Sequence, residues 1–181
     1  IFRPDRPFSW RAGQYLEWTL GHRYPDDRGN RRYFTVASSP REPAVHIGVK
    51  FYSTPSTFKR ALAAMKPGAT ISASHLAGGF VLPNNKEKKL VFIAGGIGVT
   101  PFRSMIHHLL DTKESRPIVM FYANKTSADV AYKDIFDRAQ AELKIKTLYT
   151  PSYEKSAVPG MVNGLIDARL IVKEVPDYKE R

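Results

Sequence analysis

Residues 90–105 read LVFIAGGIGVTPFRSM, and this stretch decides the fold predicted for the second half of the chain. It opens with a continuous apolar run, residues 90–94, whose length suits a strand buried on both faces of a sheet. Gly95, Gly96 and Gly98 follow and allow a sharp turn in which no side chain covers the backbone amides. The run and its glycines therefore predict a buried strand that ends in a tight turn.

A helix is predicted directly after the glycines. Thr100 is expected to be its N-cap, and Pro101 suits a first helical turn. Apolar residues then recur at helical spacing from Phe102 onward. Unpaired amides and the helix dipole point the same way at such a start, so the turn favours an anion such as a diphosphate. The alternative for this stretch alone is a strand-to-helix turn that binds nothing.

The rest of the second half repeats this rhythm. Residues 117–123 and 145–150 are predicted as buried strands, residues 129–143 as a helix, and Asp167 as the cap of a last helix. Alternation of strands and helices predicts a parallel sheet with helices on its faces. Ligands of such sheets bind at the carboxyl ends of the strands, where residues 95–100 lie.

The first half has the pattern of an antiparallel sheet. Residues 14–22, 31–40 and 44–52 are three predicted strands joined by polar loops. Ser56 is expected to cap a helix, which offers a second helix start to an anion, and residues 69–82 return to strand character. The strands predict an antiparallel sheet or barrel, and the fold class expected for this half is an antiparallel β-barrel with one helix.

A polar, lysine-rich connection at residues 83–89 is the best candidate for a domain boundary. The predicted organisation is two domains: residues 1–86 form the β domain, and residues 87–181 form the α/β domain with a parallel sheet.

Composition excludes several classes of function. The chain has 181 residues and no Cys, which excludes disulfides, thiolate metal sites and cysteine nucleophiles. Its five His residues show no metal-ligand spacing. No apolar run has the length that a membrane-spanning helix needs.

The charge balance is strongly basic. Lys and Arg number 28 against 17 Asp and Glu, which gives a net charge of +11. Nucleic acid, an anionic membrane surface, an acidic protein or anionic cofactors could balance this charge. Nucleic acid is disfavoured because no aromatic-interleaved or zinc-finger signature accompanies the basic residues.

Two motifs together carry a family resemblance. Residues 32–38, RYFTVAS, resemble the flavin motif Arg-x-Tyr-Ser/Thr-x-x-Ser of the ferredoxin-NADP⁺ reductase superfamily. Residues 95–103, GGIGVTPFR, look like the nicotinamide-dinucleotide loop of the same superfamily. Residues 48–50 and 56–58 also match its segments along the ribityl chain and pyrophosphate of the flavin. The resemblance covers the whole chain.

The resemblance implies roles for individual residues. Arg32 would pair with a flavin phosphate, Phe34 would stack on the isoalloxazine ring, and Thr35 would hydrogen-bond near the flavin N5 and O4, where hydride arrives. Phe34 and Thr35 are thus the catalytic candidates. The alternatives are a solvated Arg32, a core Phe34 and a strand-forming Thr35. The cofactor-binding set that the resemblance implies is Arg32, Phe34, Thr35, Val36, Gly48, Val49, Lys50, Ser56, Thr57, Gly95, Gly96, Gly98, Thr100 and Lys125.

In this set Lys125 is the candidate contact for a 2′-phosphate, and the choice between NADH and NADPH stays open. The family pattern also departs at both ends, because its first strand is expected before Ile1 and its Cys-Gly-Pro-Pro segment after Arg181. The chain is therefore expected to be a fragment, and its NAD(P)-binding domain is expected to be incomplete at the C-terminal end.

The function that the resemblance implies is a flavin-dependent oxidoreductase. Hydride would pass from NADH or NADPH to FAD, which most of the family uses in preference to FMN, and electrons would pass on to a one-electron acceptor. The basic charge favours an acidic carrier such as a ferredoxin or flavodoxin, and a fused redox domain is the other acceptor. The alternative is a non-catalytic flavin- or nucleotide-binding module of a larger assembly. The expected location is the cytoplasm, or the cytoplasmic face of a membrane if the parent chain carries a membrane domain.

Overall fold

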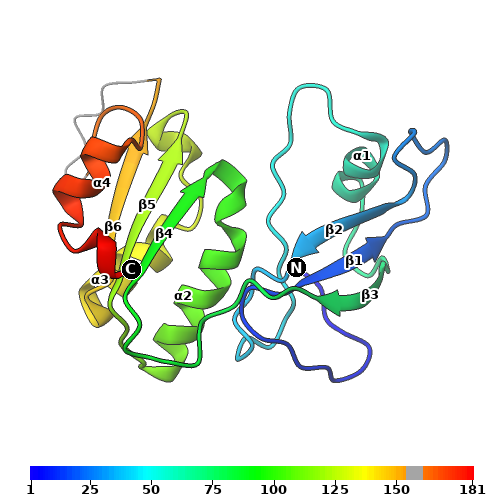
Figure 1. Cartoon of the computed structure of the whole chain (residues 1–181). Helices are drawn as coiled ribbons and strands as arrows, with labels where there is room; N and C mark the ends of the chain where they lie inside the picture. The colour runs from blue at the N-terminus through cyan, green and yellow to red at the C-terminus, as the bar shows by residue number, and fades with distance from the viewer. Residues whose placement is uncertain (154–160) are drawn as a thin grey trace.

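The computed structural model describes residues 1–153 and 161–181 and contains two sheets with different strand directions (Figure 1). Strands β1 (Tyr15–Thr19), β2 (Arg31–Thr35) and β3 (Ser72–Ala77) form an antiparallel sheet in the order β2-β1-β3. We call this part the β half. Leu16 and Trp18 of the central strand are buried, as their alternation predicts. The sheet remains open, so the expected closed barrel is wrong for the described residues.

The third predicted strand, residues 44–52, does not form. Val45 makes only an isolated bridge to Phe2, with two backbone hydrogen bonds of 2.8 Å. The chain then leaves the sheet and runs between the two halves of the molecule, as the cyan trace in Figure 1 shows. Long-range contacts at Gly48 and Lys50, described below, hold the segment there. The apolar alternation of this segment therefore does not reflect a strand.

Helix α1 (Thr57–Ala63) begins where the sequence predicts. The Ser56 hydroxyl accepts a hydrogen bond of 3.3 Å from the Lys59 amide and so caps the first turn. Phe58 is fully buried and packs in one core with Trp18 and Val36. This packing fixes the helix against the sheet.

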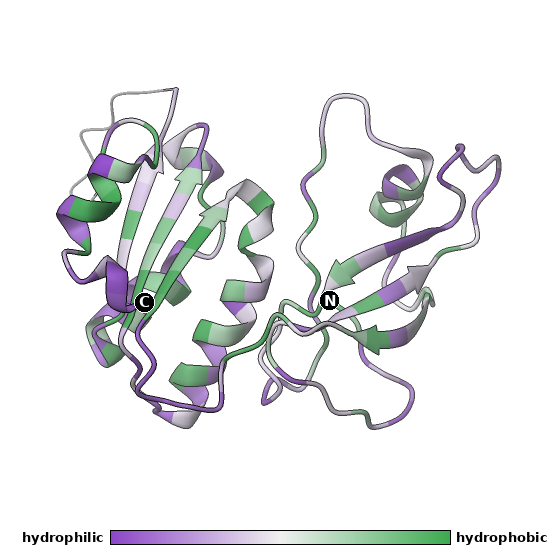
Figure 2. Ribbon diagram, viewed as in Figure 1, coloured by the Kyte–Doolittle hydropathy of each residue, from purple (hydrophilic) through white to green (hydrophobic). Residues whose placement is uncertain are grey.

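The second half, which we call the α/β half, has the predicted parallel sheet. Strands β4 (Leu90–Gly95), β5 (Ile118–Asn124) and β6 (Lys146–Pro151) pair in that order. Figure 2 shows the apolar residues concentrated along these strands and on the helix surfaces that face them. A last helix, α4 (Ala168–Glu174), is capped by Asp167, whose carboxylate accepts a 2.8 Å bond from the Leu170 amide.

Helices cover both faces of this sheet. Helices α2 (Thr100–Thr112) and α3 (Lys133–Leu143) share one core with Phe92, Met120 and Tyr122, whereas α4 packs on the opposite face around Phe121. Short 3₁₀ turns complete the fold at Gly96–Val99, Ser127–Asp129 and Tyr178–Glu180.

Three local expectations are corrected. Val99 rather than Thr100 is the N-cap of α2, because the turn Gly96–Val99 leads straight into the helix and no side chain caps it. Helix α3 begins at Lys133 rather than at residue 129, because Tyr132 lies in the left-handed region with φ of 59°. Ile93 is 52% exposed, so edge strand β4 is buried on only one face at this position.

Candidate functional site

No other group covers the backbone of the glycine turn after β4. Gly96 has φ of +49°, the left-handed region that favours glycine. A Cβ atom added at Gly95, Gly96 or Gly98 would meet no other group within 4 Å. The turn thus leaves room above the backbone at the carboxyl end of a parallel strand, which is what a pyrophosphate requires.

The same edge of the sheet carries polar groups. Thr150, near the end of β6, is 1% exposed, and its hydroxyl has no hydrogen-bond partner within residues 1–153 and 161–181. Lys125 follows β5 and is exposed, with its Nζ 5.8 Å from the centre of the Tyr153 ring. Thr150 is not among the site residues predicted from the sequence, although a polar residue near the carboxyl end of a predicted strand is a usable signal.

The predicted flavin segment 48–50 contacts the dinucleotide loop. A Cβ atom on Gly48 would lie 2.4 Å from Thr100 Cγ2 and 2.6 Å from the Tyr132 hydroxyl, so only glycine fits. Lys50 Nζ lies 2.8 Å from Asp129 Oδ1, and this contact with Asp129 raises the pKa of Lys50. The structure therefore brings two of the predicted sites together at this segment.

Val49 lies on the other side of the segment. It lines a pocket with Phe51, Leu62 and Met65. Its side chain therefore faces the α1 side of the β half.

Arg32 is buried within the β half and is not a solvated charge. Its guanidinium donates to Asp26 Oδ1 over 3.0 Å, and its carbon Cζ lies 5.2 Å from the centre of the Phe58 ring. The carbonyls of Arg28 and Gly29 in the β1–β2 loop and of Arg31 at the start of β2 also accept bonds from Nη1. Together these hydrogen bonds hold the guanidinium against the loop.

Asp26 connects Arg32 to the start of helix α1. Its Oδ2 accepts a 3.1 Å bond from the Thr57 amide, and its own amide donates to the Thr57 hydroxyl over 3.0 Å. Burial would raise the pKa of Asp26, but the hydrogen bonds from Thr57, Arg28 and Arg32 outweigh it and lower the pKa. The predicted phosphate ligands are thus adjacent, with a carboxylate bound between them.

Strand β2 ends with the residues that are expected to contact the flavin ring. Phe34 is half-buried and tilts against Phe58 with ring centres 6.0 Å apart. Thr35 is half-buried at the last position of the strand. Val36 is fully buried, and its amide donates to the Gln14 carbonyl over 2.9 Å. The Val36 side chain therefore belongs to the core, while Phe34 and Thr35 retain exposed surface.

Comparisons with known proteins agree with this geometry. Residues 92–180 match the family model described as Oxidoreductase NAD-binding domain. An NADPH oxidoreductase of Mycobacterium tuberculosis is 29% identical over 178 residues, which are 96% of this chain and 44% of that protein. An NAD(P)H-flavin reductase of Aliivibrio fischeri is 25% identical, over 86% of this chain and 66% of that protein.

Solved structures of known proteins align with most of this chain. The Amycolatopsis cytochrome P450 reductase aligns with a TM-score of 0.77 at 21% identity, over 95% of this chain and 51% of that chain. Ferredoxin-NADP⁺ reductase from Plasmodium falciparum aligns with a TM-score of 0.68 at 19% identity, over 86% of this chain and 71% of that chain. The α/β half matches an oxidoreductase NAD-binding domain, and the chain has the fold of the ferredoxin-NADP⁺ reductase-like flavoproteins. The sequence-based identification is thereby confirmed, and the chain spans only part of the curated relatives.

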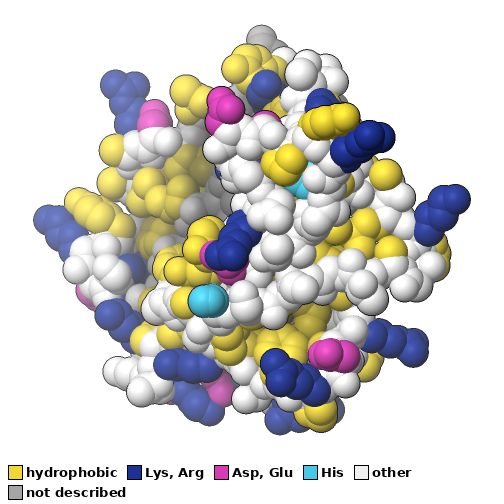
Figure 3. Space-filling view, turned by 90° about the vertical axis from the view of Figure 1, so that its right-hand side faces the viewer, with side chains coloured by type: hydrophobic (Ala, Val, Ile, Leu, Met, Phe, Trp, Pro, Cys, Tyr) yellow, Lys and Arg dark blue, Asp and Glu magenta, His cyan; other side chains and the backbone are white. Residues whose placement is uncertain are grey.

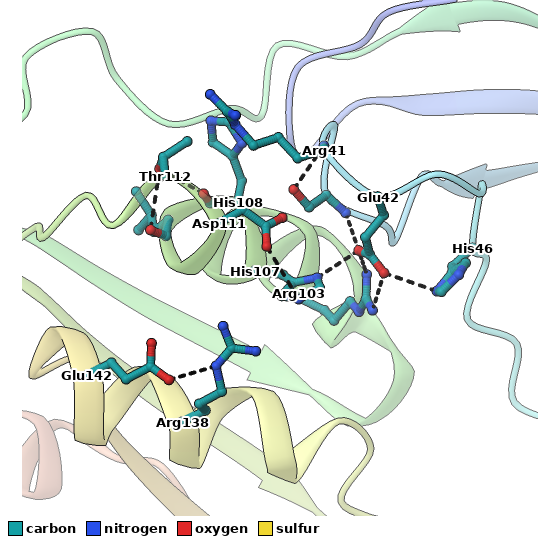
Figure 4. Close-up of polar contacts among 12 residues, drawn as sticks. Arg41, Glu42, His46, Arg103, His107, His108, Asp111, Thr112, Arg138 and Glu142 are labelled. Atoms are coloured by element: carbon teal, nitrogen blue, oxygen red, sulfur yellow. Dashed lines mark hydrogen bonds and ion pairs between the residues drawn. The ribbon is translucent and has the colours of Figure 1, made fainter. Parts of the chain in front are cut away.

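In this ferredoxin-NADP⁺ reductase-like chain a polar cluster that sequence reasoning missed joins the two halves (Figure 4). Arg103 of α2 is 5% exposed and makes a bidentate pair with Glu42, which lies in the turn after β2. Glu42 also accepts bonds from His107 Nδ1 over 2.7 Å and from the Ser39 amide over 2.6 Å. Burial would raise the pKa of Glu42, but the bonds from Arg103, Ser39 and His107 lower it to about 2.

This low pKa gives the reductase-like fold a defined acid sensitivity. Because the pKa of Glu42 is lower in the folded state, its stabilisation is complete above about pH 4.5 and is lost as the pH falls toward about 2. We expect the free energy of unfolding to fall by up to about 3 kcal/mol over this range through Glu42. Urea unfolding of the wild type and Glu42→Gln across these pH values measures the difference. Parallel pH profiles for the two proteins would contradict the assignment.

Proposed function

We propose that this chain is the cofactor-binding part of an NAD(P)H-dependent flavoprotein reductase, with residues 1–86 holding FAD and residues 87–181 holding the dinucleotide. The observation that supports this proposal most strongly is the contact at Gly48, where the predicted flavin segment meets the dinucleotide loop at Thr100. Hydride transfer needs the two cofactors side by side, and this contact supports that arrangement. Bound FAD supplies the conversion from hydride to single-electron transfer.

In the proposal the β half binds and orients the flavin. Arg32 binds a flavin phosphate after Asp26 has moved aside, because the carboxylate now holds the guanidinium. Ser56 and Thr57 complete the contact with the pyrophosphate. Phe34 supports the ring by stacking, and Thr35 donates a hydrogen bond near the ring position that accepts hydride.

The α/β half binds the dinucleotide in the same proposal. The glycine turn holds its pyrophosphate, since the space above Gly95, Gly96 and Gly98 is open. Lys125 is exposed at the same edge and supplies a cation for a 2′-phosphate. A preference for NADPH over NADH that is lost in Lys125→Ala would support this assignment, and equal use of both dinucleotides by the wild type would contradict it.

Anaerobic titration of the FAD-loaded full-length protein with NADH or NADPH tests the proposed reaction. We expect the visible absorbance of the oxidised flavin to bleach within the time of mixing by one of the two dinucleotides. If neither dinucleotide reduces the bound FAD, the proposed reductase activity is wrong. That result would favour a non-catalytic cofactor-binding module.

The electron acceptor proposed is an acidic carrier protein or a fused redox domain. The chain has a net charge of +11, and the face shown in Figure 3 carries Lys and Arg side chains around its rim. Long-range attraction of this kind raises association rates roughly 10- to 1000-fold and is screened by salt. The described residues contain no helix with the length and hydropathy of a membrane span. A cytoplasmic location, free or at a membrane face, is part of the same proposal.

Salt dependence distinguishes the two kinds of acceptor. We expect electron transfer to a ferredoxin or flavodoxin to slow steeply between about 10 mM and about 0.5 M salt, because the attraction is screened. Turnover with ferricyanide, a small acceptor, is the control and is expected to change less. A flat salt profile with every acidic carrier would contradict the charge-steered partner and favour a fused acceptor domain.

A further inference from the structure

The contact between the two halves is built from polar groups close to both predicted cofactor sites. Arg103 Nη1 donates to the Ala37 carbonyl over 2.8 Å, and the Ser104 hydroxyl donates to the Ser38 carbonyl over 2.7 Å. Ala37 and Ser38 come directly after the segment that ends in Thr35 and Val36. One side of the contact is therefore continuous with the strand that carries the flavin candidates.

The other side of the contact is continuous with the dinucleotide loop. Arg103 lies in the first turn of α2, directly after the glycine turn Gly96–Val99 and Thr100. Its guanidinium also lies over the Tyr132 ring, with Cζ 5.5 Å from the ring centre. The hydroxyl of the same Tyr132 also lies close to Gly48. Movement of Arg103 would therefore shift the helix start that presents the dinucleotide.

Glu42 is the centre of this arrangement (Figure 4). Both of its carboxylate oxygens contact Arg103, and Oε2 also accepts from His107 and from the Ser39 amide. His46 Nδ1 lies 3.6 Å from Oε1. The Glu42 side chain is 14% exposed and that of Arg103 is 6% exposed, so water screens the pair weakly.

We propose that Glu42 is a positioning residue for hydride transfer, which sets the distance between the flavin and the nicotinamide by fixing α2 against the segment after β2. This inference rests on the proposed function. Glu42 acts through Arg103 and His107 on the helix and through the Ser39 amide on the strand side. Rates of hydride transfer respond steeply to such positioning, and a displacement of about 1 Å can cost about 100-fold.

Glu42→Gln in the FAD-loaded full-length protein tests this role, because it keeps the shape of the side chain and removes its charge. We expect the FAD content and the dissociation constant of the oxidised dinucleotide to stay within about twofold of wild type, since neither predicted binding site contains Glu42. The rate of flavin reduction at saturating dinucleotide is expected to fall about 10- to 100-fold. The kinetic isotope effect with dinucleotide deuterated at the transferred position should rise or stay at its full value, because hydride transfer then limits the rate.

Glu17→Gln is the matched control. Glu17 is a buried glutamate of the β half, 8% exposed, which accepts a hydrogen bond from Tyr33 and pairs with Arg31. Among the described residues it makes no hydrogen bond or ion pair with α2. Its substitution is expected to leave the rate of flavin reduction unchanged. Glu42→Asp, which keeps the charge on a shorter side chain, is expected to give an intermediate rate.

Three outcomes would overturn the positioning role. They are a wild-type rate in Glu42→Gln, an equal loss of rate in Glu17→Gln, and a joint loss of FAD and dinucleotide binding in both Glu42 variants. A wild-type protein whose flavin is not reduced at all would instead refute the proposed function, so the two failures are distinguishable.

Discussion

Replacing Gly96 with valine is expected to abolish reduction by NAD(P)H while the protein keeps its FAD. Gly96 has φ of +49° and open space above it, so a β-branched side chain there is strained and fills the room for the pyrophosphate. Losing one or two amide bonds to a charged phosphate, at about 1.5–3 kcal/mol each, corresponds to a dissociation constant raised roughly 10- to more than 1000-fold. Titration of the FAD-loaded variant with NADH and NADPH measures the change.

The chain offers a matched control for backbone strain. Gly164 lies in the same half with φ of +113° and no neighbour within 4 Å of an added Cβ. Gly164→Val is therefore strained in a similar way but lies outside the glycine turn. Normal dinucleotide binding in Gly96→Val, or an equal loss of binding in Gly164→Val, would contradict the assignment of the turn.

Replacing Arg32 with alanine is expected to release FAD from the protein. A guanidinium gives charge-assisted bonds to phosphate, each worth about 1.5–3 kcal/mol, so we expect the dissociation constant of FAD to rise by about 100-fold. Equilibrium dialysis against FAD measures it. Arg32 also holds the β1–β2 loop through Asp26, so this variant alone does not separate binding from folding.

Asp26→Asn makes that separation. It replaces the carboxylate that now binds the guanidinium with a neutral amide. The ion pair is therefore removed while Arg32 stays in place. We expect Asp26→Asn to bind FAD at least as tightly as wild type. Asp27→Asn, an exposed neighbour in the same loop, is the control for charge and is expected to have little effect. A loss of FAD in Asp26→Asn as large as that in Arg32→Ala would mean that Arg32 is structural and does not bind the flavin.

The sequence predicts those parts of the fold that local patterns determine. The strand at 90–94, the glycines after it and the apolar spacing of α2 depend on neighbouring residues, and the structure confirms the strand and the helix. Ser56 and Asp167 are confirmed as caps for the same reason. Tyr132 is an exception, because its left-handed backbone delays the start of α3 and no local pattern signals it.

Contacts between distant residues account for what could not be predicted. The apolar alternation of residues 44–52 resembles a strand, but Gly48 packs against Thr100 and Lys50 pairs with Asp129 in the other half. The sequence shows Asp26 only as part of a polar loop, because its partners Arg32 and Thr57 lie on β2 and α1. The same limit applies to Glu42, whose partner Arg103 is 61 residues away along the chain.

Transfer of a labelled hydride tests directly whether this chain passes hydride from NAD(P)H to bound FAD. The FAD-loaded full-length protein is mixed without oxygen with a dinucleotide that carries deuterium at the transferred position of the nicotinamide, and flavin bleaching is followed in time. We expect the deuterated dinucleotide to bleach the flavin more slowly than the unlabelled one, and Gly96→Val to show no bleaching with either. Bound FAD that stays oxidised with NADH and NADPH, or bleaching that Gly96→Val does not affect, would contradict the account.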